Sequence, residues 1–139
     1  MRSLVEDGLG AVETAHRKLM NTDFRTAIED SLDIDAALRP GRDQENRWDY
    51  LLGHSATGKV IAVEPHSAKQ DQIKKIIDKK EAALDQMRNH LQPTVHIVSW
   101  IWVASSNVQF ANTDKARLRL AQKGIEFAGK QLTFKHLPK

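Results

Sequence analysis

The 139-residue sequence predicts a single α/β domain in which helices cover both faces of a β-sheet. Two observations predict this fold class. Segments with helical periodicity alternate along the chain with segments rich in β-branched residues, the order expected of an α/β sandwich. In addition, the segment VHIVSWIWVAS (95–105) is apolar on both faces, which is usual for a central strand covered by helices. We expect Trp100 and Trp102 to share one face of that strand and to belong to the core.

The N-terminal part predicts two helical pieces and a loop. Apolar residues recur at helical spacing from about Leu9 to Met20, and a break or cap follows at 21–23. A second helical piece is expected over 24–31, with Phe24 and Ile28 on one side. The segment LRPGRDQENR (38–47) is interpreted as a loop because of its Pro-Gly pair and its polarity.

The stretch GHSATGK (53–59) resembles a nucleotide-binding P-loop, but its surroundings favour a turn. Val60 stands where that motif needs a hydroxyl for magnesium, and a strand-like run (60–63) follows where it needs a helix. We therefore predict a β-hairpin with strands near 47–53 and 59–65 and no nucleotide binding at the turn. We also expect His54, in this turn, to be solvated.

The C-terminal half predicts two helices and three strands. Apolar residues recur at three and four over 67–91, so a long helix is expected there, with Ser67 as its cap and Lys80 as a lysine whose stem lies on the apolar stripe. A second helix is predicted over 113–123, ended by Gly124. Short terminal strands are expected at 125–127 and 131–134, after the strand at 95–105.

Composition excludes several classes of protein. The absence of cysteine excludes disulfides, thiolate catalysis and cysteine-ligated zinc. No apolar run is long enough for a signal peptide or a membrane span, so we expect a soluble cytoplasmic protein without a membrane partner.

Charge is spread unevenly along the chain. Residues 1–58 hold 7 Lys/Arg and 11 Asp/Glu, whereas residues 59–139 hold 14 and 7. A basic half suits a polyanion such as nucleic acid, and the basic side chains that could follow its backbone are Lys74, Lys75, Arg117 and Arg119. A solvated lysine-rich face is the alternative explanation.

Two carboxylates of the predicted hairpin are candidate metal ligands. Asp49 lies at the start of one strand and Glu64 at the end of the next, and in an antiparallel hairpin these positions are adjacent. Two carboxylates and a backbone carbonyl suit a hard ion such as Mg²⁺ or Mn²⁺. Alternatively, Asp49 pairs with Arg47 and Glu64 caps the helix that follows Pro65.

The order of elements, with Asp49 on one strand and Glu64-Pro65-His66 on the next before a long helix, resembles the PD-(D/E)XK nuclease superfamily over residues 9–105. The resemblance implies a restriction-endonuclease-like α/β sandwich with a mixed central sheet. It also implies a divalent ion held by Asp49, Glu64 and the Pro65 carbonyl. Small members similar in size include archaeal Holliday junction resolvases and restriction-type nucleases.

Two positions depart from the family's motif. Trp48 precedes Asp49 where the motif has a proline, and the second departure, at His66, matters more. His66 stands where the family has a lysine that assists the attacking water, and Lys69 could supply the missing positive charge. The resemblance implies a metal-dependent phosphodiesterase acting on DNA or RNA. The alternative is a non-catalytic partner-binding or regulatory protein on a degenerate nuclease fold, for example a toxin-system component. The sequence leaves open a homodimer.

Overall fold

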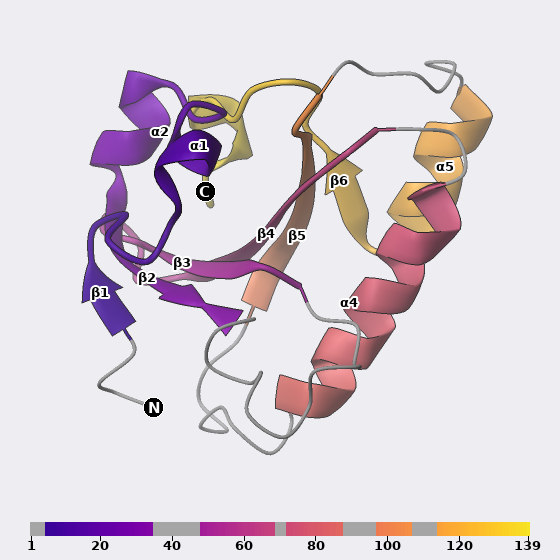
Figure 1. Cartoon of the computed structure of the whole chain (residues 1–139), viewed down its shortest axis with the longest axis horizontal. Helices are drawn as coiled ribbons and strands as arrows, with labels where there is room; N and C mark the ends of the chain where they lie inside the picture. The colour runs from indigo at the N-terminus through magenta and orange to yellow at the C-terminus, as the bar shows by residue number, and fades with distance from the viewer. Residues whose placement is uncertain (1–4, 35–47, 69–71, 88–96, 107–113) are drawn as a thin grey trace.

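The computed structural model describes residues 5–34, 48–68, 72–87, 97–106 and 114–139. They form an α/β structure with a mixed sheet of six strands and helices on both of its faces (Figure 1). In chain order the elements are β1 (Val5–Asp7), α1 (Thr14–Arg17), α2 (Thr22–Thr26), β2 (Ile28–Asp33), β3 (Tyr50–His54), β4 (Val60–His66), α4 (Ile73–Met87), β5 (Ile97–Ala104), α5 (Asp114–Gln122), β6 (Ile125–Phe127) and the short 3₁₀ helix η3 (Phe134–His136).

The six strands lie side by side in chain order, from β1 at one edge to β6 at the other. Strands β1 to β4 are antiparallel neighbours, whereas β5 runs parallel to β4 and β6 runs parallel to β5. The sheet therefore changes from antiparallel to parallel at β4. As a consequence, the first residue of β3 and the last residues of β4 and β5 lie at the same end of the strands.

Alternating residues of the inner strands divide the core into two layers. Trp100 and Trp102 of β5 belong to the layer under α4 and α5, and Ile101 and Val103 to the layer under α1 and α2. Both tryptophans are buried, so the prediction of a shared core face is confirmed. Figure 1 shows the two helix pairs on opposite sides of the sheet.

The predicted hairpin is confirmed as β3 and β4, and the segment after GHSATGK is a strand. The structure therefore lacks the helix that a P-loop requires at this place. The expectation that His54 is solvated is wrong. His54 ends β3 opposite Ile28 of β2, is 7% exposed, and its Nδ1 lies 2.8 Å from Thr57 Oγ1.

The long helix is present, but it begins later than predicted. β4 continues to His66, which lies opposite Ala104 of β5, and Ser67 and Ala68 are not helical. Ser67 is therefore not the cap of α4, which begins at Ile73. Local periodicity could not reveal that pairing with β5 extends the strand. The predicted end of the helix, beyond residue 87, lies outside the described residues.

The prediction for the N-terminal part is wrong in two respects. The second helical piece ends at Thr26, and 28–33 form β2. Asn21 does cap α2, since its side chain accepts from the Phe24 N–H at 2.9 Å. Ile28 and Ser31 are buried because β2 pairs with β3, a long-range contact that overrides helical spacing. Likewise α1 is much shorter than the predicted helix.

At the C-terminus α5 and β6 confirm the predicted helix and first terminal strand, and Gly124, with φ +71°, ends the helix. The second terminal strand is wrong, since Leu132 makes an isolated bridge to Met20 and Phe134 begins η3. Thr133 caps this 3₁₀ turn, which explains why the strand does not continue. Across the described ranges, no helix is long and apolar enough to cross a membrane.

Candidate active site

Asp49 and Glu64 form the centre of the candidate site. Tyr50 pairs with Val63, so the preceding Asp49 lies opposite Glu64. The backbone N–H of Asp49 donates to Glu64 Oε1 at 2.9 Å. The two acids are therefore neighbours at the end of the sheet where β3 begins and β4 approaches its last residue.

Both acids face α4. Leu51 and Ala62, two residues away along each strand, belong to the core layer under that helix. Lys79 of α4 reaches the two acids. Its ammonium forms an ion pair with Glu64 Oε2 and lies 3.9 Å from Asp49 Oδ1. One cation thus lies against both carboxylates.

The ion pair between Glu64 and Lys79 is buried. Glu64 is 0% exposed, and the Lys79 side chain is 12% exposed. Isolated buried charges cost several kcal/mol each, so a charge in this environment is stable only when it is paired and hydrogen-bonded. The Asp49 N–H and the Lys79 ammonium meet this requirement for the two oxygens of Glu64.

His66 lies next to this pair, at the end of β4. Its Nδ1 is 3.5 Å from Glu64 Oε2, and its Nε2 is 2.7 Å from Gln72 Oε1, just before α4 begins. If Nε2 carries the proton and donates to Gln72, a neutral ring has its Nδ1 lone pair on the side of Glu64. The strand is fixed here, because the His66 carbonyl accepts from Trp102 Nε1 at 3.2 Å and from the Ser105 N–H at 3.0 Å.

Pro65 is buried between Glu64 and His66 and lies opposite Val103 of β5. The sequence places it at the end of a strand or at a sheet edge. In the structure it lies inside β4 but beyond the β3–β4 register, which ends at Val63. Proline is tolerated there because it lacks only an N–H and retains its carbonyl.

One of the alternatives from the sequence can be tested in the structure, and two lie outside the described residues. Glu64 does not cap the following helix, because α4 begins at Ile73 and the Glu64 carboxylate binds Lys79. Arg47, the suggested partner of Asp49, lies outside the described residues, as does Lys69, the suggested source of positive charge.

The sequence reasoning missed Lys79 and considered only its neighbour Lys80. Both lysines lie between Ile76 and Ala83, which are fully buried against the sheet. Lys80 turns the other way, with its Nζ 5.4 Å from the Trp100 ring centroid and 2.6 Å from the Lys123 carbonyl. Burial lowers the pKa of Lys80, against the opposing effect of Glu81. The sequence marks Lys79 only as a second lysine between the apolar positions 76 and 83, and which residues it reaches depends on how α4 docks on the sheet.

The predicted basic surface is present in part. Lys74 and Lys75 are exposed on α4, and Arg119 is exposed on α5. Lys74 is 3.5 Å from Asp78, so its charge is partly offset. The side chain of Arg117 lies outside the described residues.

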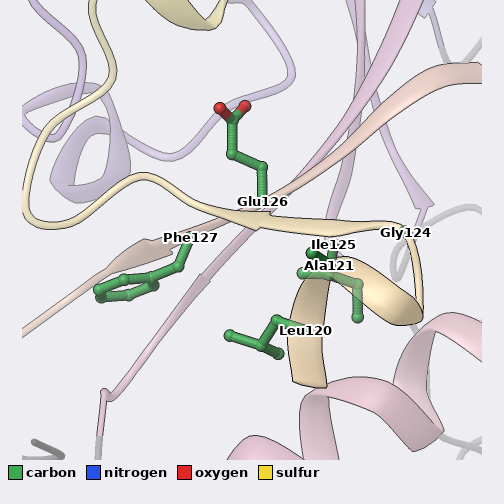
Figure 2. A pocket seen from close by; sticks show the side chains of 6 residues that line it. All are labelled: Leu120, Ala121, Gly124, Ile125, Glu126 and Phe127. Carbon is green, nitrogen blue, oxygen red and sulfur yellow. The ribbon is translucent and has the colours of Figure 1, made fainter. Parts of the chain in front are cut away.

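A pocket of about 390 Å³ lies between α5 and β6, away from the candidate site. Figure 2 shows Leu120 and Phe127 on one side of β6 and Glu126 pointing to the other. None of its lining residues belongs to the cluster around Glu64. We base the functional argument on that cluster, because it combines a buried charge with groups that can transfer protons.

No protein-family model, curated protein or solved structure matches this chain. Within the part of the chain that the structure describes, no group of three or more His, Cys, Asp or Glu side chains is arranged to hold a metal ion. Asp49 and Glu64 are a two-carboxylate set, and further ligands for an ion would have to come from a carbonyl or from water.

Proposed function

We propose that the protein is a metal-dependent phosphodiesterase that cleaves DNA or RNA on a restriction-endonuclease-like fold. One observation carries the proposal: Asp49 and Glu64 lie side by side, with His66 and Lys79 against the same carboxylate. A buried carboxylate in contact with a histidine and a lysine is an arrangement that functional sites use.

The order of elements supports the same proposal. Asp49 directly precedes β3, Glu64 and His66 lie near the end of β4, and a long helix, α4, follows before β5. This is the order on which the resemblance to the PD-(D/E)XK nucleases rests. The mixed sheet and the helices on both faces agree with the α/β sandwich that this resemblance implies.

Asp49, Glu64 and the Pro65 carbonyl would hold the divalent ion, since carboxylate and carbonyl oxygens are the ligands that Mg²⁺ and Mn²⁺ prefer. Such an ion lowers the pKa of water and stabilises the charge on a phosphate. The contact with Asp49 N–H and the burial of Glu64 orient that carboxylate before any ligand arrives.

His66 is the candidate general base. Its Nε2 lies 2.7 Å from Gln72 Oε1, and in the tautomer that donates to this oxygen, Nδ1 on the side of Glu64 is the nitrogen that would accept a proton from the attacking water. Lys79 is the described lysine in contact with the acids, and in the absence of an ion it supplies the positive charge beside them. Exposed Lys74, Lys75 and Arg119 would contact the phosphate backbone.

A non-catalytic, partner-binding role on the same fold is the second candidate. The observation that favours it is that Lys79 already neutralises the charge of Glu64, without any added ion. In that case the cluster is structural, and the protein would act by binding a partner, for example as a toxin-system component.

Cleavage assays separate the two candidates. Single-stranded, duplex and branched DNA and RNA are incubated with the wild type and Mg²⁺ or Mn²⁺, and with Asp49→Asn. The matched control is Glu81→Gln, an exposed carboxylate on α4. We expect metal-dependent cleavage that Asp49→Asn lowers by about a hundredfold or more and Glu81→Gln leaves unchanged. Absence of cleavage of every substrate would favour the non-catalytic role.

A further inference from the structure

The ammonium of Lys79 lies where a divalent ion would bind. A carboxylate that ligates Mg²⁺ or Mn²⁺ places its oxygen roughly 2.0–2.2 Å from the ion. The oxygen atoms of Asp49 and Glu64 that face α4 are the ones that contact Lys79 Nζ. An ion in contact with both carboxylates would therefore lie against the ammonium.

Two features hold Lys79 in this position. The helix is anchored on the sheet by Ile76 and Ala83, both 0% exposed, on either side of Lys79 along the chain. The lysine side chain itself is only 12% exposed. Because the helix is fixed by packing, displacement of the ammonium would have to come from rotation of the flexible lysine side chain.

We propose that Lys79 is an internal counter-ion that competes with the divalent ion for Asp49 and Glu64, so that metal binding requires its displacement. The inference rests on the proposed function and describes how the same site is regulated. In contact with the two acids, the Lys79 ammonium places a single positive charge beside them. A divalent ion in the same place would carry twice that charge and interact more strongly with both carboxylates.

The competition sets a threshold for metal binding. A ligand that must displace an internal group binds more weakly than it would to the vacant site, by the free energy of the contact that is lost. The ion pair thereby keeps Glu64 stable in the absence of metal and makes occupancy depend on the metal concentration.

The direct test is Mn²⁺ binding by titration calorimetry to the wild type, Lys79→Met and the control Lys115→Met, an exposed lysine on α5. We expect Lys79→Met to bind Mn²⁺ at least about tenfold more tightly than the wild type. Lys115→Met should equal the wild type. Equal or weaker binding by folded Lys79→Met would overturn the competition and leave the proposed metal site intact. Absence of Mn²⁺ binding in both proteins would overturn both.

A second measurement uses the wild type alone, because Lys79→Met leaves Glu64 without its buried cation and costs stability. Lysines are acetylated with and without Mn²⁺, and the rate at each is followed by mass spectrometry, with Lys74 and Lys75 as internal references. We expect Mn²⁺ to accelerate acetylation of Lys79 several-fold while the reference rates stay constant. An unchanged Lys79 rate at Mn²⁺ concentrations that saturate the site would overturn the inference.

Discussion

Asp49 donates its backbone N–H to the fully buried carboxylate of Glu64, across the β3–β4 pair, at 2.9 Å. This contact joins the start of one strand to the end of the next and orients the carboxylate that also meets Lys79 and His66. The consequences of this arrangement can be measured on stability as well as on activity.

Removal of Lys79 should destabilise the fold. Lys79→Ala leaves Glu64 buried without its cation, and breaking a buried pair in this way costs about 3–5 kcal/mol. Urea unfolding measures the loss, and Lys74→Ala, an exposed change on the same helix, should lie within about 0.5 kcal/mol of the wild type. A Lys79→Ala protein as stable as the wild type would show that Glu64 is not held by this pair.

An apolar pair should restore much of that stability. In Glu64→Leu/Lys79→Leu both charges disappear together, and such replacements are often neutral or stabilising. We expect the double variant to be more stable than Lys79→Ala in the same urea titration, while Mn²⁺ binding is lost. A double variant less stable than Lys79→Ala would argue that packing, and not the lost charge, limits this position.

Tyr50 provides a pH test of the opposite face of the sheet. Burial raises the pKa of Tyr50 well above its ordinary value, and nearby acids such as Glu13 and Asp49 add to the effect although the Glu13 N–H opposes it. Because the pKa is raised on folding, this contribution to stability is complete below about pH 10 and is lost as the pH rises beyond it.

The chain has a single tyrosine, so absorbance at the tyrosinate band reports Tyr50 alone. We expect no tyrosinate up to the pH at which near-ultraviolet circular dichroism shows unfolding. Reversible ionisation near the ordinary value of about 10, with the fold intact, would contradict the burial of this hydroxyl beside His16.

The turn at 53–59 should not bind nucleotides, because Val60 replaces the required hydroxyl and β4 replaces the required helix. Millimolar ATP or GTP should leave the melting temperature of the wild type and of Lys59→Ala unchanged. A nucleotide-dependent rise that Lys59→Ala abolishes would show that the turn is a phosphate site.

His66 should matter for rate if the site is active. We expect His66→Ala to lose at least about tenfold in metal-dependent cleavage, a low value for the loss of a general base. His66→Lys, which restores the residue type of the family's motif, should retain activity. Full activity in His66→Ala would move the role to Lys79 or to Lys69.

Local sequence patterns predicted those helices and strands whose formation depends mainly on neighbouring residues in the chain. The hairpin was readable from a β-branched run beside a glycine-containing turn, and α4 and α5 from apolar residues at helical spacing. β2 was not readable, because Ile28 and Ser31 also fit a helical face and only pairing with β3 makes them a strand.

The acids of the site were predictable, and their cation was not. Asp49 and Glu64 are neighbours by hairpin geometry, which the sequence contains. Lys79 reaches them only through the docking of α4 on the sheet, a tertiary contact between residues fifteen positions apart. The exposure of His54 was predicted wrongly for a similar reason, since its burial depends on pairing with β2.

A crystal soaked in Mn²⁺ shows whether Asp49 and Glu64 form a divalent-ion site. We expect an anomalous peak within about 2.0–2.6 Å of an oxygen from each carboxylate, with Lys79 Nζ moved away from both. An intact contact between Lys79 and Glu64 at millimolar Mn²⁺, without a peak between the acids, would contradict it.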